Sequence, residues 1–183
     1  MRELIVVRHG ETEGNLAGIA QGRRPYPLTE RGEAQARAVA RFLETVAWQP
    51  DRWITSPVLR CVETAAIVTD RLGVEAAQPV EAFTEIDCGE AEGKQFSAPA
   101  TGFEAFGGES DQALFARVGA GLDALPRDES VLVFTHGGVF KAILHHLLEF
   151  RGWLGLRCGT CMRLERRGER IAFTHFLHPE EVE

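Results

Sequence analysis

Arg8, His9 and Gly10 lie directly after the short apolar run at residues 4–7 and could act chemically on an anion. A buried strand that ends there would release them into a loop, and open α/β sheets bind ligands outside the carboxyl ends of their strands. An imidazole at such a place can act as a nucleophile, and a neighbouring guanidinium can hold an anion. This stretch therefore predicts an anion-binding site with a candidate nucleophile.

A second histidine occupies the same kind of position far downstream. His136 follows the apolar run at residues 131–134 and precedes Gly137 and Gly138. Two strands that each end in His-Gly can place both imidazoles at one edge of one sheet. The glycine pair would also open a helix, whose free N–H groups favour an anion.

The elements that must position these residues alternate between strand and helix patterns. Residues 3–8 predict the first strand, and Thr29 is a suitable N-cap for a helix over residues 30–46. Apolar residues that recur at helical spacing would form the buried stripe of that helix: Ala34, Ala38, Phe42 and Val46.

A further arginine is brought to the site by the helix predicted after a second strand at residues 53–55. Ser56 would be the N-cap of this helix and Pro57 its first residue, and Gly73 would end it. Arg60 then lies about one turn into the helix, so its side chain can point back toward the edge of the sheet.

The remaining segments complete an α/β pattern. Helices are predicted over residues 109–125 and 138–149, with a strand over residues 130–135 between them. Two short runs, residues 162–164 and 171–173, predict an antiparallel pair near the end of the chain. Strands that alternate with helices indicate a mostly parallel sheet. A length of 183 residues predicts a single domain over 1–183.

Residues 93–108 predict a long loop inside this domain. The segment is rich in Gly, Ala, Ser and Pro but carries Phe96, Phe103 and Phe106. A loop of this length is often a lid or a binding loop. The phenylalanines could cover an apolar part of a substrate or tuck onto the core, and we favour the second interpretation.

Composition restricts the class of protein. Hydrophobic residues make up 44% and charged residues 26% of the chain, as in ordinary globular proteins. The 20 basic and 27 acidic residues give a net charge of −7, which argues against a nucleic-acid binder but permits a local arginine cluster. No run has the length of a membrane span or of a signal peptide. We therefore expect a cytoplasmic protein without a membrane or nucleic-acid partner.

The cysteines are too few and too scattered for a disulfide framework. Cys158 and Cys161 form a CxxC pair, but it opens the predicted C-terminal strand pair and has no second CxxC to match it. A redox motif would stand at the start of a helix, so a packed pair or an incidental disulfide is the better interpretation.

Eight motifs occur in the order in which one enzyme family carries them. They are RHGET at 8–12, Asn15, Gln21-Gly22, LTERG at 28–32, SPVLRCVETA at 56–65, FTEIDCGEAEG at 83–93, GGES at 107–110 and THGG at 135–138. Together they resemble the histidine phosphatase superfamily, in its phosphoglycerate-mutase-like branch, and above all short bacterial phosphatases such as α-ribazole phosphatase. The resemblance extends to about residue 166 and implies an α/β three-layer αβα sandwich, with a mostly parallel central sheet and helices on both faces.

The resemblance also implies a role for each matched residue. His9 would attack phosphorus in its neutral form and become a phosphohistidine. Arg8, Arg60 and His136 would hold the non-bridging oxygens, and Glu85 would protonate the leaving group and later activate water. Further hydrogen-bond donors would come from four residues: Asn15, Gln21, Gly22 and Gly137. No metal and no cofactor are implied.

Three functions remain open at this point. The first is a metal-independent phosphomonoesterase acting on a small phosphorylated metabolite, with α-ribazole phosphate as one candidate. The second is a phosphoglycerate mutase, which would need a basic cluster where this chain has Lys94 and no further arginine until Arg117. The third is a non-catalytic phosphate-binding module, against which the complete motif set argues. The leaving group and the oligomeric state, with a homodimer as one option, do not follow from the sequence.

Overall fold

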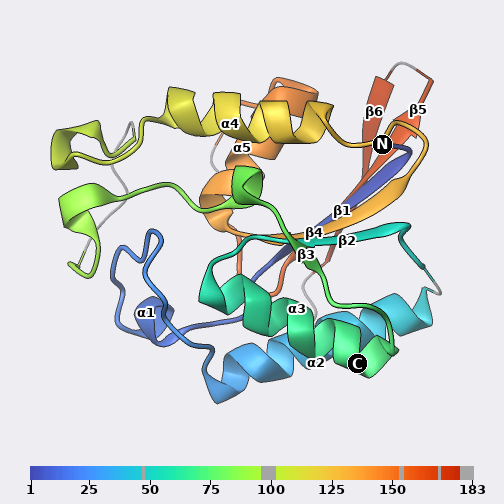
Figure 1. The fold of residues 1–183 in the computed structure, drawn as a ribbon, viewed down its shortest axis with the longest axis horizontal. Coiled ribbons are helices and arrows are strands. Elements are labelled where there is room, and N and C mark those ends of the chain that lie inside the picture. Colours follow the sequence, from blue (N-terminus) through green and yellow to red (C-terminus); the bar gives the residue numbers. More distant parts are fainter. Residues whose placement is uncertain (47, 96–101, 153–154, 169, 178–183) are drawn as a thin grey trace.

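The chain folds around a six-stranded sheet with helices on both faces (Figure 1). The structure, a computed structural model, describes residues 1–46, 48–95, 102–152, 155–168 and 170–177. The strands are β1 (Glu3–Arg8), β2 (Arg52–Thr55), β3 (Gln78–Pro79), β4 (Ser130–Thr135), β5 (Cys161–Arg167) and β6 (Arg170–Leu177). The α-helices are α1 (Glu13–Leu16), α2 (Glu30–Thr45), α3 (Leu59–Leu72), α4 (Asp111–Asp123) and α5 (Gly137–Leu148). Short 3₁₀ turns are η1 (Glu81–Phe83), η2 (Gly89–Ala91) and η3 (Glu104–Phe106).

The order of the strands across the sheet is β3-β2-β4-β1-β5-β6. The first four of these are mutually parallel, and β5 and β6 continue the sheet as an antiparallel pair. Helices α2 and α3 cover one face, and α4 and α5 cover the other (Figure 1). The predicted three-layer αβα sandwich with a mostly parallel sheet is therefore confirmed, as is the antiparallel pair at its end.

Burial on both faces explains why the central strands are continuous apolar runs instead of alternating ones. Along β1, Leu4 and Val6 belong to the cluster packed against α4 and α5, whereas Ile5 and Val7 belong to the cluster packed against α2 and α3. Each of these four side chains is buried. β1 is thus held from both sides, which fixes the point where Arg8 leaves the sheet.

The prediction of the buried stripe on α2 was wrong in part. Thr29 does cap the helix, and Ala38 is buried, but Ala34 is exposed and Val46 lies beyond the last turn with 45% of its surface exposed. The buried residues are instead Gly32, Gln35, Ala36, Ala38, Val39, Ala40 and Leu43. The packed face is wider than a single i, i+4 row, because α2 packs against both the sheet and α3.

The start of α3 also differs from the prediction. Ser56 and Pro57 precede the helix, and Val58 stands at the N-cap without a side-chain hydrogen bond. The end is as predicted, because Gly73 adopts the left-handed conformation that closes a helix. The Ser56 hydroxyl accepts from the Val58 amide at 3.3 Å and is also hydrogen-bonded to an imidazole of the site described below.

Two further sequence predictions are settled by the fold. Cys158 and Cys161 are free thiols, not a disulfide, and Cys161 is buried in β5. Of the phenylalanines in the loop at residues 93–108, Phe103 and Phe106 pack against the core, whereas Phe96 lies outside the described residues. None of the described helices has both the length and the apolar character that crossing a membrane requires.

Candidate active site

A cavity of about 360 Å³ opens at the carboxyl ends of β1 and β4. These strands are parallel neighbours, and Arg8 is paired in register with Thr135. Their next residues, His9 and His136, therefore emerge side by side, with ring centroids 5.4 Å apart. The predicted site residues that line the cavity are Arg8, His9, Asn15, Gln21, Gly22, Arg60, Glu85 and Gly137. His136 is completely buried directly beside this lining.

His9 is held in the neutral state with one ring nitrogen committed. Its surface is 2% exposed, and burial together with the charges of Arg60 and Arg8 lowers its pKa well below 6.5. Nδ1 lies 2.7 Å from the Gly10 carbonyl, so Nδ1–H donates there and Nε2 keeps its lone pair. A neutral imidazole with a free lone pair is the form that can act as a nucleophile.

The loop that carries His9 is fixed by backbone contacts. A Cβ on Gly10 would lie 2.3 Å from the Gly32 carbonyl oxygen, so only glycine permits this approach to the start of α2. The Gly10 amide donates to the Thr64 hydroxyl, and Gly159 of the CxxC segment donates to the His9 carbonyl. The CxxC segment therefore has a structural role: it packs against the nucleophile loop.

Two guanidinium groups converge on His9, and each has an unused donor. Arg60 is 1% exposed and donates to the backbone carbonyls of Gly22 and Arg24, and Arg8 donates to the Leu156 carbonyl. The Nε–H of Arg8 and the Nε–H of Arg60 are buried and have no hydrogen-bond partner among the residues that the structure describes. Buried donors without partners are costly, so this pair is suited to an anion that would complete their hydrogen bonding.

His136 stands at the N-cap of α5, beside the free N–H groups of that helix. Burial and the positive charges of Arg60 and Arg8 lower its pKa well below 6.5. Its Nε2 lies 2.7 Å from the Ser56 hydroxyl oxygen and 3.4 Å from the Cys61 sulfur. Sequence reasoning missed both partners, since the Ser-Pro pair was interpreted as a helix start.

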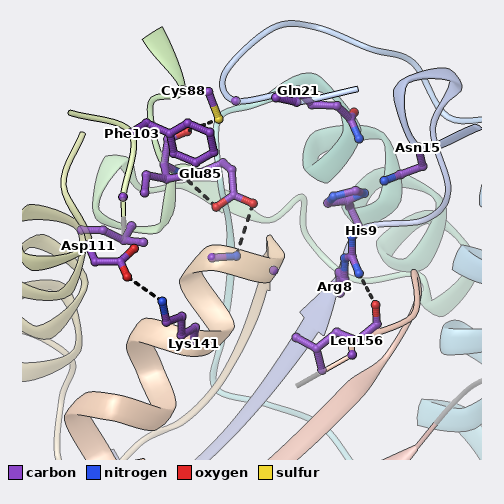
Figure 2. A pocket seen from close by; sticks show the side chains of 18 of the residues that line it. Arg8, His9, Asn15, Gln21, Glu85, Cys88, Phe103, Asp111, Lys141 and Leu156 are labelled. Carbon is purple, nitrogen blue, oxygen red and sulfur yellow. Dashed lines mark hydrogen bonds and ion pairs between the residues drawn. The ribbon is translucent and has the colours of Figure 1, made fainter. Parts of the chain in front are cut away.

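Glu85 reaches the cavity from the loop that follows η1 and lies opposite His9 (Figure 2). One carboxylate oxygen accepts from the Ile86 amide at 3.0 Å, and the other accepts from the Gly138 amide at 3.4 Å. A Cβ on Gly138 would lie 2.4 Å from the Glu85 Oε1. The second glycine of the Thr-His-Gly-Gly motif therefore makes room for this carboxylate.

An arginine on α4 holds the Glu85 loop. Arg117 donates to the carbonyls of Ala82 and Thr84 at 3.1 and 2.9 Å, and it forms an ion pair with Glu109 at 2.7 Å. Glu109 belongs to the GGES motif, and its carboxylate also accepts from the Asp87 amide. The motif thus ties α4 to the acidic loop, a role that sequence reasoning did not assign.

The amides of Asn15 and Gln21 border the arginines. The Asn15 Oδ1 accepts from the Thr12 amide at 3.1 Å, and the Gln21 Oε1 accepts from the Thr12 hydroxyl at 2.8 Å. The NH₂ group of each side chain turns toward the cavity (Figure 2). The Gly22 carbonyl accepts from Arg60 at 2.9 Å, which places this backbone beside the guanidinium group.

The far side of the cavity, which we call the apolar end, is lined by Ile86, Phe103, Leu114, Leu144 and Phe150. It also contains Lys141 of α5 and Asp111 of α4, which form an ion pair at 2.6 Å (Figure 2). We call the opposite side, formed by Arg8, His9 and Arg60, the arginine end. Sequence reasoning had offered Phe103 as a residue that could cover an apolar part of a substrate, and here it does line the cavity. It did not find Lys141 and Asp111, because they lie in helices without a recognisable motif.

Comparisons with known proteins agree with this geometry. A sequence profile described as the histidine phosphatase superfamily (branch 1) matches residues 4–174. The uncharacterised phosphatase PhoE of Bacillus subtilis is 32% identical over 151 residues, which cover 79% of this chain and 76% of PhoE.

Two further relatives have more specific names. A 2,3-bisphosphoglycerate-dependent phosphoglycerate mutase of Methylobacterium radiotolerans is 34% identical over 164 residues, covering 78% of this chain and 77% of the mutase. The adenosylcobalamin/α-ribazole phosphatase of Salmonella typhimurium is 30% identical over 163 residues, covering 79% of each chain.

A solved structure extends the likeness to three dimensions. The mycobacterial glucosyl-3-phosphoglycerate phosphatase Rv2419c in complex with VO3 superimposes with a TM-score of 0.79 at 26% identity, covering 95% of this chain and 98% of that chain. The predicted resemblance is therefore confirmed.

Proposed function

This chain belongs to the histidine phosphatase superfamily and is a phosphatase enzyme, and from that premise we propose that it hydrolyses small phosphomonoesters without a metal, through a phosphohistidine on His9. The observation that carries the proposal is a pair of buried Nε–H donors, on Arg8 and Arg60, which have no partner in the described part of the chain and flank a neutral imidazole. A tetrahedral dianion placed there would satisfy both donors and present its phosphorus to the Nε2 lone pair of His9.

The first chemical step forms the phosphoenzyme. The His9 Nε2 attacks phosphorus, the bond between phosphorus and the ester oxygen breaks, and Glu85 gives its proton to the departing alkoxide. Arg8, Arg60 and the N-terminus of α5 stabilise the negative charge on the transferring group. Asn15 and Gln21 supply further donors from the loops around α1.

The second step returns the enzyme to its starting state. Water attacks the phosphohistidine, Glu85 accepts the proton of that water, and the bond between phosphorus and nitrogen breaks to release inorganic phosphate. Glu85 is suited to both steps because it lies across the cavity from His9, on the side from which the alcohol leaves and water enters.

The mutase alternative has named relatives in its favour. A mutase must grip the carboxylate of a glycerate phosphate while the phosphate changes position. Arg117, the first arginine after the acidic motif, is instead committed to Glu109 and to the carbonyls of the Glu85 loop. This commitment favours transfer of the phosphate to water.

A trapping experiment tests the proposal. The enzyme, kept in EDTA, is mixed with ³²P-labelled phosphoesters, including α-ribazole phosphate and 3-phosphoglycerate, and quenched in alkali. We expect protein-bound label that is stable in alkali and labile in acid, as for a phosphohistidine, and release of inorganic phosphate. The His9→Ala variant should carry no label.

Other outcomes would redirect the assignment. Conversion of 3-phosphoglycerate to its 2-isomer, with no inorganic phosphate, would establish the mutase instead. Binding of phosphoesters with neither label nor turnover would identify a phosphate-binding module and would sink the proposed mechanism.

A further inference from the structure

The apolar end of the cavity is where the alcohol part of a substrate must lie. The phosphate is placed by the arginine end, and Glu85, the proposed proton donor, stands between the two ends. Beyond Glu85 the walls are formed by Phe103 of the loop before α4, Leu114 of α4, and Leu144 and Phe150 at the end of α5. Such walls bind apolar surface and offer few hydrogen bonds.

The charges at this end are already balanced. Among the described residues that line the cavity, the cations are Arg8, Arg60 and Lys141. Lys141 is the one outside the arginine end, and its ammonium group is bound to Asp111 at 2.6 Å.

A second contact keeps the lysine where it is. The Lys141 Nζ lies 5.5 Å from the ring centroid of Phe115, which stacks in turn on His145. The ammonium group is therefore held by a carboxylate on α4 and by the face of an aromatic ring. A substrate carboxylate could reach Lys141 only by competing with Asp111, which would remain beside it as a like charge.

From this arrangement we propose that the phosphoester hydrolysed here has an uncharged leaving group with an apolar ring, and that Asp111 is a specificity-determining residue that excludes carboxylated esters by occupying Lys141. The inference rests on the proposed phosphatase function and names the class of its substrate. The proposed substrate class includes the phosphate esters of neutral, ring-bearing alcohols and excludes phosphoglycerates and phosphorylated amino acids.

A matched pair of esters tests the charge directly. Benzyl phosphate and 4-carboxybenzyl phosphate share the ring and the ester bond, and the methylene group insulates the leaving oxygen from the added carboxylate. We expect kcat/KM for benzyl phosphate to exceed the value for 4-carboxybenzyl phosphate, and the value for 3-phosphoglycerate, by about tenfold or more, because the carboxylate loses solvent without gaining a cation.

A variant should then reverse part of the selectivity. Asp111→Asn removes the competing carboxylate and leaves Lys141 available, so the kcat/KM ratio of the carboxylated to the plain benzyl ester should rise about fivefold. Asp123→Asn is the matched control, because Asp123 also lies on α4 and pairs with a residue of α5, His146, outside the cavity. That control should leave the ratio unchanged.

The possible failures are distinguishable. Wild-type enzyme that hydrolyses 4-carboxybenzyl phosphate or 3-phosphoglycerate as fast as benzyl phosphate would overturn the inference and leave the phosphatase function intact. A selectivity ratio that Asp111→Asn does not raise would overturn the role of Asp111. Absence of turnover with every phosphoester would count against the proposed function itself.

Discussion

The arginine end and the apolar end of the cavity differ in how their charged side chains are paired. At the arginine end, Arg8 and Arg60 are packed beside two histidines that burial keeps neutral, and the Nε–H of each arginine has no partner among the described residues. At the apolar end, Lys141 is paired with Asp111 among leucine and phenylalanine side chains. Unpaired donors make the first end a site for an anion, and the completed ion pair makes the second end a site for neutral groups.

The two ends also differ in how they are built. The arginine end is formed at the last residues of β1 and β4 and at the first turn of α3. These residues are held in place by strand pairing and by core packing. The apolar end is formed by the loop before α4 and by helices α4 and α5. Chemistry that needs accurate geometry is therefore placed on the sheet, and recognition of the leaving group is placed on the helices and loops around it.

The largest effect should come from removing the nucleophile at the arginine end. His9→Ala should lower kcat by about 10⁴-fold or more, since it removes the imidazole that we propose forms the phosphoenzyme. His146→Ala is the control, because His146 is paired with Asp123 on the surface. Steady-state phosphate release measures both, and a His9→Ala enzyme with wild-type kcat would refute the mechanism.

Removal of one anion-binding donor should have the next largest effect. Arg60→Gln should lower kcat/KM by about 10²–10³-fold, because buried donors stabilise the transferring phosphoryl group more than the ground state. Arg71→Gln on the same helix, where Arg71 forms an exposed ion pair with Glu44, should change it less than about twofold. Equal losses in the two variants would show that the arginine end has no special role.

Glu85, which lies between the two ends, should matter in proportion to the basicity of the leaving group. Glu85→Gln should lower kcat by about 10²-fold for alkyl phosphates, which need a proton, and far less for 4-nitrophenyl phosphate, which does not. Glu90→Gln, an exposed carboxylate in η2, is the control. A loss that is the same for both ester classes would contradict the proton-donor role.

The smallest effect concerns stability and pH. Burial lowers the pKa of His9 and His136 in the folded state, whereas in the unfolded chain both protonate as the pH falls below about 6.5. Their neutral state therefore favours folding fully above that pH, and stability is lost as the pH falls below it. Between about pH 7.5 and about pH 5.5 each histidine should remove on the order of 1 kcal/mol of unfolding free energy.

Urea unfolding at these two pH values measures the effect. His9→Ala should reduce the loss by the share of one histidine, whereas His146→Ala should not. An unchanged pH dependence in His9→Ala would mean that His9 takes up its proton at the same pH in the folded and the unfolded protein, so that burial does not keep it neutral.

Much of the fold could be predicted because local patterns agreed with tertiary packing. The apolar runs of β1 and β4, the Thr29 cap of α2 and the Gly73 end of α3 lie as expected. The predictions that were wrong concern places where a tertiary contact outweighed a local preference. Ser56 has the side chain of an N-cap but is bonded to His136, and the buried face of α2 is set by its contacts with α3 as well as with the sheet.

By itself, the sequence determined the family and the residues that belong to the arginine end, because these lie in short motifs at the ends of strands and helices. The tertiary structure alone decided how those residues are charged and paired: which guanidinium donors are unused, which histidine nitrogen is free, and that Glu85 rests against Gly138. It also decided the character of the apolar end. Lys141 and Asp111 are 30 positions apart in the chain, and only the packing of α4 on α5 brings their opposite charges together.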